Sequence, residues 1–462
     1  MKRSFLIVVL VCLIHFVNAQ NYLNGKIKIY FTKSVDTTVS TGVYAQQLYK
    51  AIDDTLVAYI NRTKHDLDIA IYNYTYASTI SDIAGAINAA YNRGVKVRMI
   101  YDGSVSNTGL KNILPAIPQV ASPQGSNYNI MHNKFVIIDS KTNNTNDAIV
   151  WTGSTNWSSN MFYLDDNNVV ILQDQPLALA YRTEFEEMWG DTGLIPNPAK
   201  ARFGKYKTDN TPHQFTIDGK QVELYFSPSD HVNSQVIKTI TTANSDFEFC
   251  LLQFSRNDIA DSVVSMKTKN PDLISMGIED PSGLLVGKPA YDTMKTVMGS
   301  NLLTENQPNS LLHHKYLIVD QSNPLSDPLV LTGSHNWTTT ADTKNDENTL
   351  VIHDPTIANI YYQEFIARFK ENGGVLGVND VKEENNFTIY PNPANGNVTI
   401  KATGEFSKQM HLEFYDMMGK LFFSRLMSGQ EEIINASLYN KGIYFVKIVS
   451  GSGSIVKKLV LN

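Results

Sequence analysis

Apolar and polar positions along the chain fall into two blocks that repeat one order of elements. Residues 27–36 (IKIYFTKSVD) and 222–230 (VELYFSPSD) each begin with alternating apolar residues, which is typical of a strand, and a helical stretch follows each. Residues 65–75 (HDLDIAIYNYT) and 245–254 (SDFEFCLLQF) then change from charged to apolar, as a strand entering a sheet does. Small and apolar residues recur at helical spacing over 82–94. The pattern predicts strands that alternate with helices.

Both blocks also end alike. Residues 149–159 (IVWTGSTNWSS) match 329–339 (LVLTGSHNWTT), and an amphipathic helix closes each block, with the sequences YRTEFEEMW and YYQEFIARF. Strands alternating with helices predict an α/β fold with mixed sheets, and two such blocks predict a duplicated, pseudo-twofold α/β/α sandwich. We expect the halves to span residues 22–195 and 219–372, joined by a linker over 196–218 that is rich in proline, lysine and polar residues.

The last part of the chain has a different pattern. After a second expected linker, residues 373–386, short strand-like runs alternate with turns such as Asn392–Gly396 and Asn440–Gly442. Residues 387–462 are therefore predicted to form a small all-β sandwich.

The first 19 residues read as a targeting segment. A basic start precedes an apolar run over residues 5–17, and the small residue Ala19 follows shortly afterwards. This pattern is typical of a secretory signal peptide, which we expect to be cleaved before Gln20. No later stretch of the sequence is long and apolar enough to cross a bilayer. The chain is therefore predicted to leave the cytoplasm.

Composition changes this picture only slightly. The 462 residues carry a formal net charge of −6 with a pI near 5.9, and 42% are hydrophobic, which is ordinary for a globular protein. An acidic balance weighs against a protein that depends on non-specific phosphate contacts. Of two cysteines, Cys12 lies in the predicted signal, so Cys250 is alone in the mature chain and is expected to fill the core.

One short motif occurs in both blocks. MHNKFVIID ends at Asp139 and LHHKYLIVD ends at Asp320, and each contains a histidine, one spacer and a lysine. Positions two apart on a strand face the same side, so His132 lies beside Lys134 and His313 beside Lys315. Lysine is a poor metal ligand at neutral pH, and we predict no metal and no cofactor. A histidine–lysine pair suits an anion, with lysine as a point charge and imidazole as a nucleophile or proton carrier.

A glycine-serine turn follows each motif and adds further polar groups. The turns place Ser154 and Asn156 after the first motif and Ser334 and Asn336 after the second. Hydroxyl and amide groups can donate hydrogen bonds to phosphoryl oxygens. Two copies brought face to face would surround one phosphate with two histidines, two lysines and two asparagines, a set that can stabilise five-coordinate phosphorus without a metal.

These paired motifs resemble the signature of the phospholipase D superfamily, over residues 27–370. The resemblance implies a phospholipase D-like fold and a phosphodiesterase that works through a phosphohistidine intermediate at the interface of the halves. It implies catalytic roles for the motif residues and phosphate-binding roles for the turn residues. In that family the motif aspartates tend to be structural. The implied catalytic residues are His132, Lys134, Asp139, His313, Lys315 and Asp320, and the implied phosphate-binding residues are Ser154, Asn156, Ser334 and Asn336.

The resemblance also implies an acidic residue that orients each histidine. Glu347 fits this role in the second block, whereas the aligned position in the first block is Asn167, for which Asp166 or Asp165 could substitute. A carboxylate favours the imidazolium and an amide does not. We therefore predict that His313, backed by Glu347, protonates the leaving group while His132 attacks phosphorus.

The tail resembles the C-terminal sorting domain of the type IX secretion system. The resemblance is carried by YPNPANGNVTI, FYDMMGKLFF and LYNKGIYFVKI, with KKLVL at the end. It implies the type IX secretion machinery as a partner and a location outside the cell or on its surface.

The motifs leave the substrate open. Phospholipid at a membrane surface is our first hypothesis, giving phosphatidic acid and a head group, because the chain is acidic and lacks Lys/Arg clusters near the motifs. Cleavage of DNA or RNA by the same chemistry is the alternative. A surface adhesion protein with a decayed site is disfavoured, since both copies keep His, Lys, Ser and Asn. We expect the catalytic part to be monomeric.

Overall fold

The computed structural model describes residues 21–125, 128–376, 387–402, 411–417, 419–427, 429, 431–450 and 453–462. The predicted signal peptide (1–19) and most of the second predicted linker (373–386) lie outside these residues. The chain divides into a larger unit, residues 1–375, and a smaller unit, residues 376–462.

The first half of the larger unit is built on a seven-stranded sheet with the order β1-β7-β6-β5-β2-β3-β4. Its strands are β1 (Ile27–Phe31), β2 (Asp66–Ile71), β3 (Lys96–Tyr101), β4 (Gln119–Ala121), β5 (Lys134–Ile138), β6 (Ile149–Gly153) and β7 (Asn168–Leu172). Its α-helices are α1 (Ile52–Asn61), α2 (Ile83–Asn92), α3 (Ser159–Tyr163) and α4 (Gln175–Trp189).

The second half repeats this arrangement on an eight-stranded sheet with the order β12-β11-β10-β13-β14-β15-β9-β8. Its strands are β8 (Gln214–Ile217), β9 (Lys220–Ser227), β10 (Asp246–Leu251), β11 (Ile274–Glu279), β12 (Leu302–Thr304), β13 (Lys315–Val319), β14 (Leu329–Gly333) and β15 (Glu347–His353). Its α-helices are α5 (Val232–Ile240), α6 (Asn257–Lys269), α7 (Leu284–Met298), α8 (Thr339–Thr343) and α9 (Pro355–Glu371).

The two strand orders correspond one to one, apart from the additional edge strand β8. In both sheets the pairs equivalent to β2–β3 and β3–β4 are parallel and the others are antiparallel, so both sheets are mixed. The predicted duplication and α/β class are confirmed. The residues predicted as a linker between the halves, 196–218, differ from that expectation because they contribute β8 to the second sheet.

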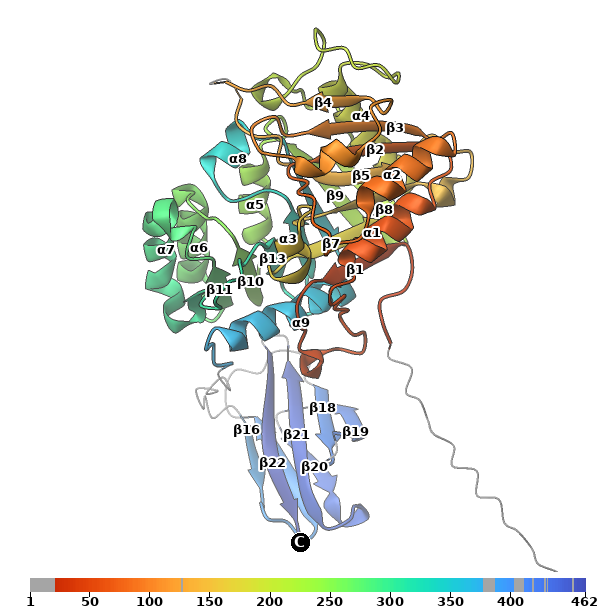
Figure 1. The fold of residues 1–462 in the computed structure, drawn as a ribbon. Helices are drawn as coiled ribbons and strands as arrows, with labels where there is room; N and C mark the ends of the chain where they lie inside the picture. The colour runs from red at the N-terminus through yellow and green to blue at the C-terminus, as the bar shows by residue number, and fades with distance from the viewer. Residues whose placement is uncertain are drawn as a thin grey trace, which may run out of the picture. The chain divides into compact units, whose positions relative to one another are not determined.

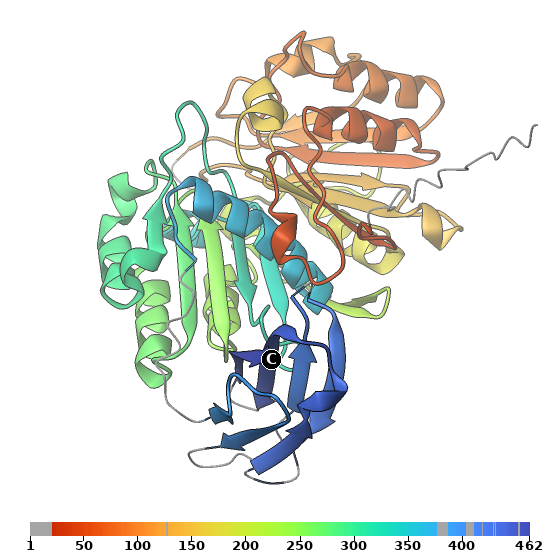
Figure 2. The same ribbon diagram turned by 90° about the horizontal axis from the view of Figure 1, so that it is seen from below.

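Helices cover both faces of the first sheet. In β2 (DLDIAI), Leu67 and Ile69 face α1 and α2, and they belong to one apolar cluster with Leu56 of α1 and Ile87 of α2. The intervening side chain Asp68 faces α4 on the other side. Figure 1 shows α1 and α2 side by side over these strands, and Figure 2 shows α9 running across the second sheet. Because successive side chains of a strand point to opposite faces, the sheet packs against α1 and α2 on one face and against α4 on the other.

Both sheets have one end at which β2, β3 and their equivalents finish and β5 and β13 begin. The register fixes this end, because Ile71 pairs with Lys134 and Leu251 pairs with Lys315. We call it the motif end. The turns after β6 and β14 open there too, at Gly153 and Gly333. The repeated motifs and turns of the sequence are therefore brought to one end of each sheet.

The smaller unit is all-β, as predicted. A three-stranded sheet has the order β16-β17-β20, and a four-stranded sheet has the order β19-β18-β21-β22. The strands are β16 (Phe387–Tyr390), β17 (Asn397–Ala402), β18 (His411–Tyr415), β19 (Leu421–Leu426), β20 (Glu431–Asn435), β21 (Gly442–Ser450) and β22 (Gly453–Leu461). All pairings between these strands are antiparallel. Within the described parts of both units, no helix combines the length and apolar character needed to span a bilayer.

Candidate active site at the interface of the two halves

The first histidine–lysine pair lies where β5 begins. Lys134 is the first residue of β5, and its Nζ donates a hydrogen bond to the carbonyl oxygen of His132 at 2.5 Å. The backbone N–H of His132 donates to the carbonyl of Asp346, in the other half, at 2.9 Å. Both side chains are buried, with 5% of His132 and 3% of Lys134 exposed. The other half therefore fixes the position of the motif.

The second pair repeats this geometry at the start of β13. Lys315 Nζ donates to the carbonyl oxygen of His313 at 2.6 Å, and the His313 backbone N–H donates to the carbonyl of Asp166 at 3.0 Å. Burial is the main cause that lowers the pKa of His313, and the positive charges of Lys315, Lys134 and His132 lower it further, as expected for two neighbouring pairs. The sequence-predicted histidines and lysines thus meet in one site.

Each histidine is oriented by a residue of the opposite half. Glu347 Oε2 lies 2.7 Å from Nδ1 of His132, and Asn167 Oδ1 lies 2.8 Å from Nδ1 of His313. The prediction that Glu347 backs His313 is therefore wrong. Asn167 directly precedes β7 and Glu347 is the first residue of β15, and each side chain reaches the histidine of the other repeat across the interface.

Asp165 and Asp166 do not replace Asn167 in this role. Asp166 lies 3.5 Å from the guanidinium of Arg368, and Asp165 accepts a hydrogen bond from the backbone N–H of Leu311 at 3.0 Å. Asn167 is thus the orienting residue itself, and its amide also donates to a backbone carbonyl at 3.0 Å.

The two turn serines fix the orienting residues rather than face a phosphate. Ser154 Oγ donates to Asn167 Oδ1 at 2.8 Å, and Ser334 Oγ donates to Glu347 Oε2 at 2.7 Å. Each serine is fully buried, and its only proton is used in this bond. The predicted phosphate-binding role of Ser154 and Ser334 is therefore not supported, because neither hydroxyl has a proton left to donate.

The two turn asparagines keep unused hydrogen-bonding capacity. Asn156 and Asn336 are 5% and 8% exposed. Their Oδ1 atoms are buried and have no hydrogen-bond partner within the described part of the chain. A buried carbonyl oxygen without a partner is costly, so each Oδ1 is suited to accept a hydrogen bond from a ligand or water.

The motif aspartates lie at the far ends of their strands. Asp139 accepts hydrogen bonds from the backbone N–H groups of residues 64, 65 and 66 at 2.6–3.2 Å. Asp320 accepts from those of residues 244, 245 and 246 at 2.7–3.3 Å. Both residues have a positive φ, 52° and 54°. Their place in the catalytic set is corrected: each carboxylate holds the loop that leads into β2 or β10.

Burial is the largest influence on the pKa values of the two histidines and two lysines of the site. It lowers the pKa of His132 to about 4, although Glu347 acts in the opposite direction, and it lowers the pKa of His313 well below its usual value. It also lowers the pKa of Lys134 to about 7 and that of Lys315 well below the usual range. Burial alone would raise the pKa of Glu347, but His132 and Lys134 outweigh it and lower the pKa to about 2. Four buried basic groups around one carboxylate form a site that favours an anion.

Sequence reasoning missed a buried polar network behind the site. Asn348 donates to Asn133 at 3.1 Å and accepts from Thr152 at 2.8 Å, which joins the two halves. Asn168, the equivalent of Asn348 in the first half, donates to the hydroxyl of Tyr361 in the second half at 2.9 Å. The signal was present in the chain, because an asparagine precedes the apolar run at equivalent positions of β7 and β15.

Tyr72 is a second residue that the sequence did not single out. Its ring lies 4.8 Å from the ring of His132, in an edge-on arrangement, and 5.0 Å from Lys134 Nζ. The equivalent position after β10 is Leu252, so the two sides of the site differ. An aromatic ring beside a lysine stabilises the cation when the site is dry.

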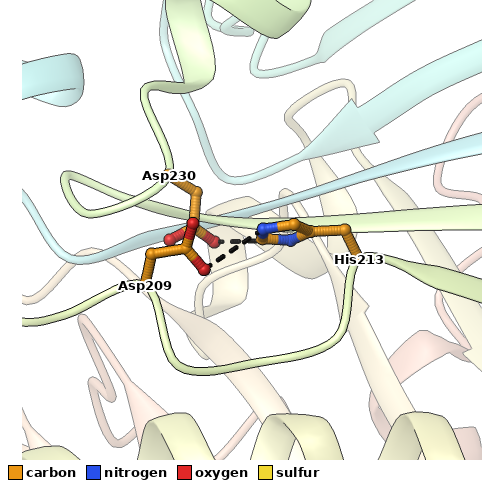
Figure 3. Close-up of side chains that lie close together, drawn as sticks. All are labelled: Asp209, His213 and Asp230. Atoms are coloured by element: carbon orange, nitrogen blue, oxygen red, sulfur yellow. Dashed lines mark ion pairs between the residues drawn. The ribbon is translucent and has the colours of Figure 1, made fainter.

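One group of side chains elsewhere could hold a metal by proximity alone. Asp209, His213 and Asp230 bring their ligand atoms within 4.8 Å of one another (Figure 3). Protein groups already use these atoms: His213 Nδ1 lies 2.9 Å from the carbonyl of Leu224, and Asp230 accepts from the Phe226 backbone N–H at 2.7 Å. These contacts account for the cluster as an anchor of the segment before β9.

Comparison with known proteins agrees with the geometry. A model of the family described as "Cardiolipin synthase, PLD-like domain" matches residues 56–189 and 236–369, and one described as "Secretion system C-terminal sorting domain" matches residues 388–462. The mitochondrial cardiolipin hydrolases of Xenopus tropicalis and Drosophila melanogaster are 28% and 31% identical over 137 and 148 residues. Each alignment covers 29% of this chain and 59% or 57% of the relative, which is less than two thirds of its length.

A solved structure shows the fold of the larger unit. The phosphatidylserine synthase of Haemophilus influenzae Rd KW20 aligns over 75% of this chain and 86% of its own, with a TM-score of 0.54 and 11% identity. The sorting domain indicates secretion or localisation at the cell surface. The chain therefore belongs to the family of the cardiolipin synthase, PLD-like domain, which it carries twice, and it ends in a type IX sorting domain.

Proposed function

We propose that the protein is a secreted phosphodiesterase that hydrolyses phospholipid to phosphatidic acid and a free head group. The observation that supports this most is the crossed pairing at the site, in which Nδ1 of His132 and of His313 is fixed by the opposite half. Since Nδ1 is engaged in each ring, Nε2 is left for chemistry. Two imidazoles placed in this way suit a double displacement at phosphorus through a phosphohistidine.

In the first step, Nε2 of His132 attacks phosphorus and the bond to the head-group oxygen breaks. A carboxylate favours the imidazolium, and taken alone that rule would make His132 the proton donor. We nevertheless assign His132 as the nucleophile. A ring that is bonded to phosphorus at Nε2 and protonated at Nδ1 is a cation for as long as the intermediate lasts, and this cation also requires a carboxylate partner. Glu347, 2.7 Å from Nδ1, stabilises that cation.

His313 has the complementary role. Its Nδ1 faces the neutral amide of Asn167, so the ring holds a proton less tightly than a carboxylate-backed ring would. The bound phosphodiester raises the pKa of His313 and lets it take up a proton, which it gives to the leaving oxygen. His313 then accepts a proton from water as the water attacks phosphorus, and this step frees His132 and forms phosphatidic acid.

The two lysines and two asparagines bind the phosphoryl group. The bound phosphodiester anion raises the lowered pKa values of Lys134 and Lys315, and the protonated lysines then supply positive charge in a buried site, where an electrostatic contact is stronger than in water. The Nδ2–H groups of Asn156 and Asn336 donate to the phosphoryl oxygens, whereas their unpartnered Oδ1 atoms can only accept. No step requires a metal or a cofactor. Both halves of the site lie within the larger unit, and we propose that one chain is sufficient for catalysis.

Single turnover on bis(p-nitrophenyl) phosphate tests the histidine roles. Nitrophenolate leaves without a proton, so His313→Ala protein should accumulate a covalent adduct on His132, visible by mass spectrometry. His132→Ala protein should form none. An adduct in His132→Ala and none in His313→Ala would reverse the assignment.

The substrate is tested separately, in excess chelator, with the mature chain. Phosphatidylcholine vesicles and single-stranded DNA are offered in one reaction, and choline release and strand cleavage are followed together. Choline release that disappears in His132→Ala supports the proposal. Strand cleavage with untouched lipid would instead identify a secreted nuclease.

A further inference from the structure

Parts of the connections around the site carry no charged side chain. Five segments leave or enter the sheets at the motif end without any Asp, Glu, Lys or Arg. We call them together the uncharged rim; they are residues 73–81 (NYTYASTIS), 103–110 (GSVSNTGL), 157–164 (WSSNMFYL), 281–287 (PSGLLVG) and 306–312 (NQPNSLL). In a chain with 18% charged residues, the lack of charge sets these five segments apart from the sequence that flanks them.

Hydrogen bonds join four of these segments directly, and the fifth adjoins them through Asp280. Within the first half, Asn73 Nδ2 donates to the carbonyl of Ser106 at 3.3 Å, and the hydroxyls of Thr79 and Ser159 lie 3.2 Å apart. Across the interface of the halves, Ser310 Oγ donates to the carbonyl of Leu164 at 2.6 Å. The Leu312 backbone N–H then donates to Asp280, which directly precedes residues 281–287, at 3.0 Å. The rim is therefore continuous and leads up to His313.

Large apolar side chains of the rim are exposed to solvent. Leu285 is 87% exposed and Val286 67% exposed, both in the first turn of α7. Tyr76, Leu164 and Leu311 are 55%, 44% and 38% exposed. Exposed apolar residues that belong to one continuous surface are typical of an interaction site.

The opposite end of the first half has the contrary character. A cavity of about 870 Å³ lies there, lined by the cationic side chains Lys64, Lys96, Arg98, Lys141 and Arg182 together with Asp66, Asp68 and Asp147. Exposed apolar residues occur at this end as well, Leu194 among them, but they adjoin charged groups. Charged groups do lie beside the rim, but they have both signs. Arg256 pairs with Asp258 and lies 3.6 Å from Asp342, Ser81 donates to Asp54, and Lys50 lies 6.0 Å from the ring of Tyr163.

We propose that the uncharged rim docks on the surface of a bilayer of zwitterionic, net-neutral phospholipid and presents the site to it. This rests on the proposed function and adds the surface by which the enzyme reaches its substrate. Charge supports this occupant, because an anionic bilayer or a nucleic acid attracts clustered, unpaired Lys and Arg, which the rim lacks. Apolar side chains beside hydroxyl and amide groups match an interface of acyl chains and neutral head groups.

A paired substitution tests the docking surface in the mature chain. Leu285→Asp/Val286→Asp adds two negative charges to the rim, and Leu325→Asp adds one at a residue that is 97% exposed between β13 and β14, away from the motif end. Each is made in the His132→Ala background, so that vesicles stay intact, and binding to phosphatidylcholine vesicles is measured by co-sedimentation. We expect at least tenfold weaker binding for the rim variant and less than a twofold change for Leu325→Asp.

Three outcomes would overturn the docking surface: unchanged binding of the rim variant, equal loss in Leu325→Asp, or binding that requires phosphatidylglycerol in the vesicles. Single-stranded DNA that competes with the vesicles would also overturn it. Failure of the proposed function has a separate readout, the turnover of soluble bis(p-nitrophenyl) phosphate by protein with an intact His132. Without that turnover the phosphodiesterase assignment fails, whatever the vesicles show.

Discussion

The two repeats differ at one buried acidic position, and this difference predicts a pH-dependent stability. In the first half, Asp68 on β2 lies beside Arg98 on β3, which donates to both carboxylate oxygens at 2.7 and 2.8 Å. The same register in the second half pairs Glu248 with Met276. Glu248 is 1% exposed, and neither of its oxygens has a hydrogen-bond partner in the described part of the chain.

Burial raises the pKa of Glu248 well above the usual value. In the unfolded chain a glutamate ionises near pH ~4.3. Between these two values the folded protein holds one proton more than the unfolded chain, so the free energy of unfolding falls by about 1.4 kcal/mol for each pH unit of increase.

Glu248→Gln removes this titration and keeps the shape of the side chain. The variant should have similar stability near pH 5 and should become more stable than the wild type by about 1.4 kcal/mol per unit above that. Urea unfolding at pH 5, 6 and 7 measures the difference. Tryptophan fluorescence is a suitable probe because all four tryptophans belong to the larger unit: Trp151, Trp157, Trp189 and Trp337.

Asp68→Asn is the matched control. It leaves Arg98 buried with a weakened partner, and we expect it to destabilise the fold by about 3–5 kcal/mol at neutral pH. If the difference between Glu248→Gln and the wild type does not grow with pH, or if the variant is less stable throughout, the reasoning is refuted. Glu248 would then be ionised and paired in the folded protein.

Two further predictions concern the motifs. Asp320→Ala removes the acceptor of three backbone N–H groups and should lower the free energy of unfolding by about 2–4 kcal/mol, while the folded fraction keeps its activity. Calorimetry and kinetics on one sample measure both quantities. A loss of activity without a loss of stability would contradict the prediction. Lys134, with a pKa of about 7, is mostly uncharged at pH 8, so sulfate binding should raise its pKa and take up a proton. Titration calorimetry in buffers of different ionisation enthalpy measures the number of protons taken up when sulfate binds. We expect Lys134→Met to take up about one proton less than the wild type. Equal uptake by the two proteins would contradict the lowered pKa of Lys134.

The sequence predicted what depends on local pattern. Alternation along a strand was enough to place Lys134 beside His132, and the repetition of the motif was enough to predict two equivalent sheets. The small β unit also followed from its turns and short strands. Each of these features is encoded within a stretch of the chain that forms one element.

The errors concern contacts between elements that are far apart in the sequence. Glu347 was assigned to His313 because both belong to one repeat, yet the start of β15 faces the other half and Glu347 meets His132. Ser154 was given to the phosphate because a hydroxyl can donate there, but the sequence does not show that Asn167 already accepts its proton. Such choices depend on how the halves pack, which no periodicity records.

The crossed contacts have a consequence for how such an enzyme can change over evolutionary time. Two identical subunits that exchanged orienting residues would impose the same environment on both histidines, since any substitution would appear twice. In one continuous polypeptide, Asn167 and Glu347 can diverge independently, and a change in one half alters the histidine of the other. Fusion thus permits two rings of one kind to specialise for different tasks, and it also prevents either half from keeping a complete site after the loss of its neighbour.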